Sequence, residues 1–437
     1  MGKRYRPYHP DDELLLPPSL RDWLPEDHLA YFVSDVVDNL DLSAMDGAYG
    51  NEKRGQPPYD PLMMTKVLIY AYCVGVFSSR KMARRLVEDI AFRVLAAGNQ
   101  PDFRTISDFR KIHLRALEGL FQEVLQIALQ AGAMKLGRVA LDGTKVKANA
   151  SKHKAMSYDR MIEKQKALKA EVKQLLAQAE AVDAEEDARH GRNRSGDELP
   201  EELKRRQDRM GKIREAKRAI QERARAKAKA EGEDPKQAKP APKDQYNFTD
   251  PESRIMRGAD GFVQAYNAQA AVEPELQLIV GQTVTQAAND KEQLMPMVAA
   301  IETQSGQLPK QLVADSGYCS EKNLETLASE QDPARCIEGF IATERQRHDE
   351  YKQACPRGPL PKNATRVDRM RRKLKTKVGK AVYAARKTIV EPVFGQIKQA
   401  RGFRQFLLRG IDKVRGEWAL VCLTHNILKL HRLCEES

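Results

Sequence analysis

The chain has 437 residues, which is enough for two or three domains with cores of their own. Hydrophobic residues make up 41% and charged residues 31%, so a soluble globular protein is expected, and the net charge of +13 favours a polyanionic partner. Six widely spaced cysteines without a CxxC pair argue against a disulfide framework or a zinc site, and the longest apolar run, residues 67–77, is too short to span a bilayer. We expect a cytoplasmic protein with no signal peptide and no membrane partner. Charge alone leaves a ribosome-associated or membrane-surface protein open.

Residues 1 to about 135 are predicted to be helical. Asp60 and Pro61 begin an apolar helix that runs to Phe77. Ser79 can cap a second helix, which has apolar residues at 82, 86, 90 and 94 on one stripe and ends at Gly98. A third helix is predicted over residues 107–132. The short turn at 76–79 is compatible with a helix-turn-helix, and a plain helical bundle is the alternative, with solvated basic residues Arg80, Lys81, Arg84 and Arg85.

The apolar period then changes to two, and residues 138–148 predict a strand. A charged insertion follows over residues 151–245. Its segments 164–180 and 201–230 are rich in strong helix formers, with a linker around 191–196 between them, and a Pro and Lys linker covers 234–242. We expect the two helices to pack as a hairpin, with disorder as the alternative.

Strand patterns return at 263–272 and 277–284, joined by a turn at Glu273 and Pro274. A helix over 289–303, a strand over 311–314, a helix after Ser320 and a strand over 336–342 follow. A basic loop that contains prolines leads to helices over 375–401 and 413–433. This order predicts an α/β fold with a mixed sheet flanked by helices. The predicted domains are a helical N-terminal domain (1–135), a catalytic domain in two parts (136–150 and 246–437) and the helical insertion (151–245).

Two aspartates share one local context. Asp142 and Asp315 each follow an apolar strand directly and precede a turn that contains glycine. Residues beyond strand ends line the functional crevice of α/β sheets. The two aspartates are 173 residues apart, so only the fold can bring them together. An aspartate before glycine is also an ordinary turn residue, which is the alternative for each of them.

A third carboxylate, Glu391, stands in the most basic part of the chain. Residues 344–415 contain 21 Lys or Arg and only 6 Asp or Glu, a surplus larger than that of the whole protein. Glu391 lies on a predicted amphipathic helix with Val390, Val393, Phe394 and Ile397 on its apolar face.

The surroundings of Glu391 suit a DNA backbone. Gly395 leaves the helix surface bare beside it, and Lys387 and Lys398 can flank it as phosphate contacts. Pro392 predicts a helix start or a kink. The alternative is an exposed glutamate in register with lysines. Further candidate DNA contacts in this segment are Arg386, Arg401 and Arg404.

Three carboxylates at the ends of neighbouring elements can hold two hard cations such as Mg²⁺ or Mn²⁺, which prefer oxygen ligands. Such a pair can activate a water or a 3′-hydroxyl and stabilise the leaving oxygen of an in-line displacement at phosphorus.

The sequence resembles the DDE transposases of bacterial insertion sequences. The resemblance rests on three blocks, Leu141-Asp142-Gly143-Thr144, residues 313–318 (VADSGY) and residues 390–398 (VEPVFGQIK). Within these transposases it is most similar to the eleven-eighty-two insertion-sequence family, with further similarity at residues 247–254, 261–269, 417–420 and 424–426. It extends over nearly the whole chain.

The resemblance implies an RNase H-like catalytic domain, two divalent metal ions, and cleavage and joining of DNA at element ends. By matching position it implies that Asp142, Asp315 and Glu391 are the metal ligands. Related transposases carry a signature of a tyrosine, a basic residue, a glutamate and a lysine. Here it corresponds to Tyr383, Arg386 or Lys387, Glu391 and Lys398. The spacing from glutamate to lysine fits, whereas the tyrosine is one residue away from its expected position when a single basic residue is chosen. Some relatives have a cysteine cluster before the last block, where this chain has only Cys355, so no structural zinc is expected. Residues that can support the site or act structurally are Asp250, Arg254 and Asn267.

The sequence is therefore interpreted as a transposase that acts on terminal inverted repeats and target DNA, as a homodimer in a synaptic complex, in the bacterial cytoplasm at the nucleoid. Two alternatives remain at this stage. One is a decayed or domesticated DNA-binding protein without catalysis. The other is a metal-dependent nuclease that never joins strands.

Overall fold

The computed structural model describes residues 19–46, 57–190, 201–258, 261–328, 336–344, 355–356 and 358–436, without side chains at 178–190 and 201–203. The predicted linker around residues 191–196 lies outside the described residues. In this part of the chain no helix combines the length and the hydrophobicity needed to cross a bilayer.

The N-terminal region is helical, as predicted. Asp60 caps α3 because its carboxylate accepts hydrogen bonds from the Leu62 and Met63 amides. The helix predicted from Ser79 onward is divided at Asp89, which is extended and whose carboxylate caps the next helix at Ala91. The elements are η1 (Leu20–Trp23), α1 (Leu29–Asp38), α2 (Ser43–Asp46), α3 (Pro61–Cys73), α4 (Ser79–Glu88), α5 (Ile90–Leu95), α6 (Phe103–Ile112) and α7 (Leu114–Gln130).

The predicted mixed sheet is confirmed. Its strands are β1 (Arg138–Lys147), β4 (Arg254–Gly258), β5 (Gly261–Val272), β6 (Ile279–Thr285), β7 (Gln311–Ala314) and β8 (Glu338–Ile341). The order is β4-β5-β1-β7-β8, with β6 also paired to β5. β5 runs antiparallel to β1, β4 and β6, whereas β7 is parallel to both β1 and β8. The strand β4, which the sequence pattern did not indicate, pairs with the first half of β5.

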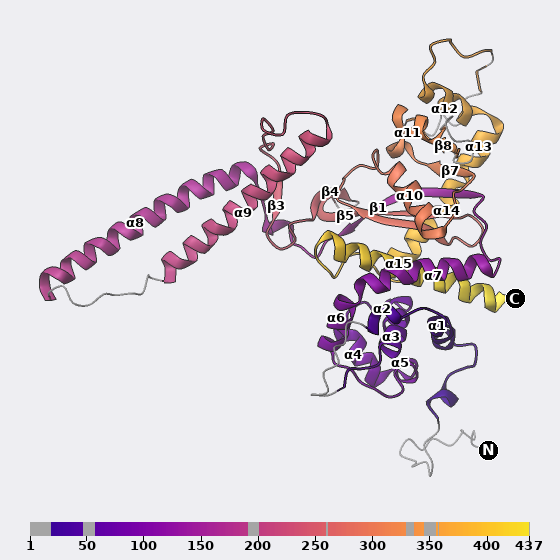
Figure 1. The fold of residues 1–437 in the computed structure, drawn as a ribbon, viewed down its shortest axis with the longest axis horizontal. Helices are drawn as coiled ribbons and strands as arrows, with labels where there is room; N and C mark the ends of the chain where they lie inside the picture. The colour runs from indigo at the N-terminus through magenta and orange to yellow at the C-terminus, as the bar shows by residue number, and fades with distance from the viewer. Residues whose placement is uncertain are drawn as a thin grey trace, which may run out of the picture.

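The charged insertion forms two long helices, α8 (Tyr158–His190) and α9 (Glu201–Ala230), which pack on each other and project away from the sheet (Figure 1). Their base is a two-stranded sheet of β2 (Ala155–Ser157) and β3 (Gln245–Asn247). A small apolar cluster joins the helices near this base through Met161, Leu168, Ile213, Ala216 and Ile220. Beyond this cluster the helices carry mostly polar residues, as expected from the charged sequence of the insertion.

The C-terminal part differs from the prediction in two places. The predicted basic loop contains α12 (Arg366–Lys375), which begins with a capping box between Thr365 and Asp368. The single helix predicted over 375–401 is divided into α13 (Lys377–Ala384), α14 (Arg386–Gly395) and a π-helical turn (Gln396–Ala400). Pro392 lies inside α14, so the predicted helix start at this residue is wrong. The remaining helices are α10 (Leu294–Ser305), α11 (Glu321–Leu327) and α15 (Ile411–Glu436).

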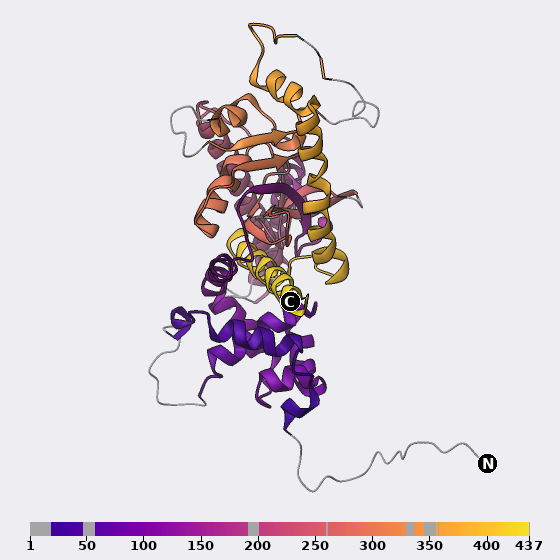
Figure 2. The same ribbon diagram turned by 90° about the vertical axis from the view of Figure 1, so that its right-hand side faces the viewer.

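Helices on the sheet fix the position of the strand ends. α14 contacts β1 and β5, while α10 and α15 contact β6. In Figure 2 the gold helices α13 and α14 run beside the edge-on strands, and α15 lies between the sheet and the N-terminal helices. Trp418 of α15 is fully buried and its Nε1 donates a hydrogen bond to the Gln269 carbonyl. α15 thereby joins the sheet to α3 and α7 in one core.

His425 on α15 gives a test of this core. Its ring is buried and Nε2 lies 3.0 Å from the Gln277 carbonyl oxygen, and burial lowers its pKa to about 3. The unfolded chain binds a proton near pH 6.5. The folded state therefore loses stability as the pH falls below 6.5, by about 2 kcal/mol from this group between pH 7.5 and pH 5.

We expect His425→Gln to remove this contribution, because glutamine can still donate to the Gln277 carbonyl and does not titrate. Urea denaturation at pH 7.5 and pH 5 measures it. The variant is expected to lose about 2 kcal/mol less than the wild type over this interval. An equal loss in both proteins would contradict the assignment.

Candidate active site

Asp142 and Asp315 lie side by side at the centre of the sheet. β1 and β7 are parallel neighbours, and Leu141 pairs with Ala314, so the residues that follow are the two aspartates. The Asp142 carboxylate accepts a hydrogen bond from the Gly143 amide, and that of Asp315 from the Gly317 amide. The two carboxylates predicted to converge are thus brought together by strand register.

The electrostatics reflect this proximity. Burial raises the pKa of Asp142 to about 6, against the lowering effect of the Arg386 guanidinium and with a further rise from Asp315. Burial also raises the pKa of Asp315, against its hydrogen bond from Gly317 and the charge of Arg386. Both sites therefore favour an added positive charge.

α14 supplies that charge and the third predicted carboxylate. Arg386 is buried, and its Nη1 lies 2.9 Å from Asp142 Oδ2. Its Nη2 lies 3.8 Å from Oε1 of Glu391, whose side chain is 53% exposed. The neighbouring residue Lys387 is exposed. The structure thus assigns Arg386, one of the two predicted basic residues, to the interior of the site.

Lys398 also turns toward β1. Its Nζ donates to Thr144 Oγ1 at 2.5 Å and to the Lys145 carbonyl at 2.8 Å. Burial, together with the charge of Lys145, lowers the pKa of Lys398 to about 8. Lys398 reaches β1 because the π-helical turn after Gly395 continues α14 alongside this strand.

One carboxylate of the site was missed by the sequence analysis. Asp290 lies between β6 and α10, and its Oδ1 accepts hydrogen bonds from Asn267 Nδ2 at 2.6 Å and Gln269 Nε2 at 2.7 Å. Lys145 Nζ lies 3.5 Å from the same oxygen. Asp290 was placed in a predicted helix, but α10 begins only at Leu294. Its position after a strand, shared with Asp315, is the signal that could have identified it, whereas Asp142, predicted to follow a strand, lies inside β1.

Glycine allows Asp290 to approach the strands. A Cβ atom at Gly143 would lie 2.3 Å from Gln269 Nε2 and 2.8 Å from Asp290 Oδ1. At Gly317 it would lie 3.0 Å from Asp315 Oδ1 and 3.6 Å from Asp290 Cβ. The glycines after the two aspartates therefore have a packing role as well as a turn role.

Some predicted residues lie elsewhere. The Arg401 guanidinium donates inside the protein, to Thr424 Oγ1 at 2.8 Å and the Val421 carbonyl at 3.1 Å, which does not favour its predicted DNA contact. Arg404 is exposed and donates to the Lys398 carbonyl. Tyr383 is half-buried near the site, where burial raises its pKa against the opposing charge of Arg386. A hydrogen bond between Tyr383 and Arg386 supports Arg386 as the basic residue that goes with Tyr383 in the signature.

Asp250 and Arg254 have structural contacts. Both oxygens of Asp250 lie 2.9 Å from the Tyr266 hydroxyl, and Oδ1 also accepts from the Gly410 amide. Arg254 Nη1 donates to the carbonyls of Pro251 and Ser253. These bonds tie the turn before β4 to the start of α15 and make no contact with the three carboxylates predicted to be catalytic.

The donor set fits a divalent metal in its chemistry. Asp142 and Asp315 offer carboxylate oxygens whose pKa values are raised chiefly by burial, and a hard cation prefers carboxylate ligands. Among the described residues, however, no group of three or more acidic, His or Cys side chains is close enough together to hold an ion. The Arg386 guanidinium instead neutralises Asp142 and approaches Glu391.

Two family comparisons match this chain. Residues 18–112, which include α1 to α6, match a family described as Transposase domain (DUF772). Residues 335–431 match a family described as Transposase DDE domain. Together the two matches support an insertion-sequence DDE transposase. No curated protein and no solved structure matches it.

The two matched segments contain only some of the candidate site residues. The DDE match contains Arg386, Glu391 and Lys398, whereas Asp142 and Asp315 lie before it. The first match covers the N-terminal helices that pack on α15 through α3. The association with the more specific eleven-eighty-two family remains a prediction.

Proposed function

We propose that this transposase cleaves DNA strands at the ends of an insertion sequence and transfers them to target DNA, with Asp142, Asp315 and Glu391 as the catalytic carboxylates. The observation that carries the proposal is the convergence of Asp142, inside β1, with Asp315, directly after the neighbouring strand β7, while Arg386 reaches from Asp142 toward Glu391. An RNase H-like core fits this arrangement, because the central strand β1 carries the first carboxylate between antiparallel and parallel neighbours.

The three carboxylates would hold Mg²⁺ or Mn²⁺, as two ions. When bound, such ions supply a nucleophile at neutral pH and stabilise charge on the leaving oxygen. The carboxylates of Asp142 and Asp315 are oriented by backbone amides, which donate to Oδ1 of each. Arg386 keeps Asp142 ionised, and Lys398 places a positive charge beside β1 where a phosphate can bind.

The partners in this proposal are the terminal inverted repeats and a target duplex. Lys387 and Arg404 are exposed on the segment that carries Glu391 and are proposed as contacts to the DNA backbone. Because two element ends must be paired for transfer, a homodimer in a synaptic complex is part of the proposal. The bacterial cytoplasm at the nucleoid is the corresponding location.

The test uses the full chain with a labelled duplex that carries the element's own terminal repeats. Intact protein and Glu391→Gln are compared with Mg²⁺, with Mn²⁺ and with EDTA. We expect metal-dependent nicking by the intact protein, loss of at least about 100-fold in the variant, and unchanged binding. Glu325→Gln, an exposed glutamate on α11, is the matched control and is expected to cut normally.

Each other outcome separates the alternatives. Equal cutting by Glu391→Gln would remove Glu391 from the mechanism. Binding without cutting by any of the proteins would favour the non-catalytic DNA-binding protein. Cutting without joined products, when target DNA is supplied, would favour a nuclease that does not transfer strands.

A further inference from the structure

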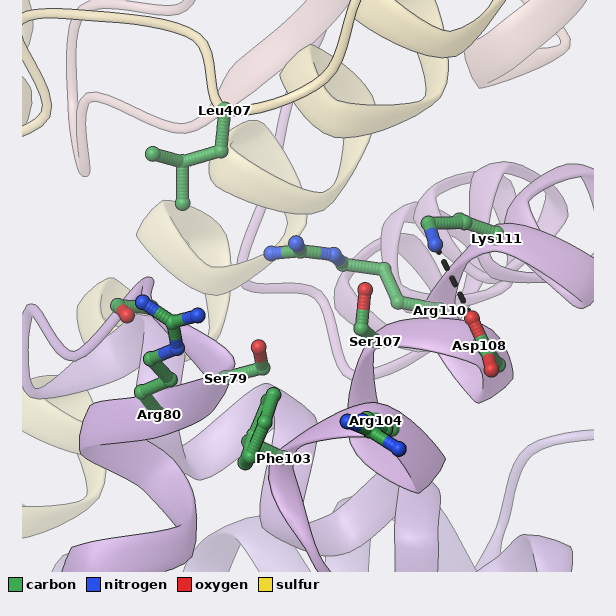
Figure 3. A pocket seen from close by; sticks show the side chains of 10 residues that line it. Ser79, Arg80, Phe103, Arg104, Ser107, Asp108, Arg110, Lys111 and Leu407 are labelled. Atoms are coloured by element: carbon green, nitrogen blue, oxygen red, sulfur yellow. Dashed lines mark hydrogen bonds and ion pairs between the residues drawn. The ribbon is translucent and has the colours of Figure 1, made fainter.

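A basic groove lies away from the carboxylates, at the junction of the N-terminal helices with the segment before α15. Its first part is a cavity of 430 Å³ between the start of α4, helix α6 and Leu407 (Figure 3). Arg80, Arg104, Arg110 and Lys111 line it, and Asp108 is the one acidic residue among the described lining residues. The cavity therefore has a surplus of positive charge.

The cations are held in place by neighbouring groups. The guanidinium groups of Arg80 and Arg104 lie 5.1 and 5.8 Å from the centre of the Phe103 ring. Lys111 Nζ lies 3.0 Å from Asp108 Oδ1. Ordered cations bind an anion at a smaller entropic cost than freely rotating side chains.

Arg110 is the second, independent feature. It is only 5% exposed, and its guanidinium extends into the space between Ser79 and Leu407 (Figure 3). Nη1 donates to the Tyr72 hydroxyl at 3.0 Å and to the Phe77 carbonyl at 3.1 Å. Its Nε is buried and has no hydrogen-bond acceptor among the described residues. A buried charged donor without an acceptor is costly, and an anion in the groove would lower that cost.

The start of α4 also faces this cavity. Ser78 and Ser79 line it, and the N-cap residue Ser78 makes no side-chain capping bond. The first turn of a helix carries free amide donors and a partial positive charge, which together favour phosphate. The hydroxyls of Ser79 on α4 and Ser107 on α6 also line the cavity and can donate to phosphate oxygens (Figure 3).

The groove continues past Leu407 into a second cavity of 290 Å³, which Lys111 and Leu407 also line. Arg409 and Lys413 add two cations here, and Arg409 Nε is held by the Asn149 carbonyl at 2.9 Å. Asn149 follows β1, so this end of the groove reaches the chain segment that leaves the catalytic strand. The two cavities are adjacent, because Lys111 and Leu407 line both of them.

We propose that this groove seats backbone phosphates of the DNA bound by the transposase, with Arg80, Arg104 and Arg110 in the first cavity and Arg409 and Lys413 in the second. The inference rests on the proposed function, since it names where that function holds its DNA. The groove joins the N-terminal helices to the residues after β1. A strand seated there is positioned relative to the catalytic domain as well as to the N-terminal helices.

The test compares two double variants that each remove two positive charges. Arg80→Ala with Arg104→Ala removes two exposed arginines of the first cavity. Arg84→Ala with Arg85→Ala is the matched control, because both residues lie on α4 outside the groove, in ion pairs with Glu88 and Asp89. Binding of a terminal-repeat duplex and of an unrelated duplex is measured by fluorescence anisotropy in EDTA from 50 to 250 mM salt.

The groove variant is expected to bind at least about 10-fold more weakly. The slope of the logarithm of its binding constant against the logarithm of the salt concentration is expected to be smaller in magnitude by about one to two, because phosphate contacts are lost. The control is expected to change affinity less than about 3-fold. Since phosphate contacts carry no sequence information, the loss is expected to be equal for the two duplexes. Equal weakening by both double variants, or a loss confined to the terminal-repeat duplex, would overturn the proposal.

Because replacing the buried Arg110 can unfold the chain, the groove is tested further by phosphate-ethylation interference with the Arg80→Ala, Arg104→Ala variant. Phosphates whose ethylation blocks binding of the intact protein are mapped. Ethylation of one or two of these phosphates is expected to have no effect on binding of the groove variant. An unchanged interference pattern would count against the groove. Because no metal is present, these results stand apart from the cleavage test of Glu391, so either proposal can fail without the other.

Discussion

Replacing Arg386 by Gln is expected to lower strand cleavage at least about 100-fold while DNA binding is retained. The buried guanidinium bonds Asp142 and lies 3.8 Å from Glu391. Preorganised charge of this kind contributes about 3 kcal/mol or more to catalysis in water-excluded sites. Single-turnover nicking of the terminal-repeat duplex measures the loss, with the binding constant determined in parallel.

The pH profile separates catalysis from a general structural effect. Arg386 lowers the pKa of Asp142 against burial, so removing it raises that pKa above about 6. The ionised carboxylate is then reached only at higher pH, and the rising limb of the rate profile is expected to move to higher pH in Arg386→Gln.

Two further variants make the result specific. Lys387→Gln changes the adjacent, exposed residue and is expected to weaken binding slightly with the cleavage step unaltered. Arg386→Lys keeps the positive charge but loses the planar guanidinium group that can donate to two carboxylates at once. Its cleavage rate is expected to lie between those of the intact protein and Arg386→Gln. If Lys387→Gln were the more damaging change, the basic residue of the signature would be Lys387 and the role given to Arg386 would be wrong.

Replacing Glu417 by Ala is expected to destabilise the protein by about 3 to 5 kcal/mol, because it leaves buried partners of a charged network without their anion. Glu417 is fully buried on α15, and one oxygen accepts hydrogen bonds from the Leu407 and Leu408 amides at 3.0 Å. The other lies 3.3 Å from the Tyr72 hydroxyl, which also accepts from Arg110. The network connects α3 and α6 with the segment before α15.

Urea denaturation measures the loss, and limited proteolysis of residues 401–410 reports on the segment that Glu417 holds. Glu417→Gln is the control, because its carbonyl oxygen can keep one amide bond, and a loss of about half the size is expected. A change below 1 kcal/mol for Glu417→Ala would show that the network contributes little.

The sequence predicted the elements that carry strong periodic signals. The apolar runs before Asp142 and Asp315 are β1 and β7, and the stripe of Val390, Val393, Phe394 and Ile397 is buried on α14 and its continuation. α12 was missed because its residues are mostly basic and the apolar side is short. The break at Ala385 was missed because nothing local marks it, and tertiary contacts of α13 and α14 with different strands decide it.

The site shows the same division. Local pattern singled out Asp142, Asp315 and Glu391 because two follow strands and one interrupts a basic helix. It left Arg386 and Lys387 undecided, since they are neighbours in sequence and differ only in direction. The structure separates them by burial, because Arg386 lies on the side of α14 that faces β1. Asp290 joins the site through hydrogen bonds from β5 and an ion pair with Lys145 of β1, contacts that no local pattern marks.

The sequence by itself determined the basic C-terminal segment and most helical and strand elements, and it predicted the three carboxylates on which the proposed chemistry rests. It could do so because periodicity and charge are local properties of the chain. The tertiary structure alone decided which groups meet. Register between β1 and β7 joins residues 173 positions apart, and the basic groove forms where the segment before α15 lies beside α4 and α6. Such contacts depend on long-range packing, which no local pattern encodes.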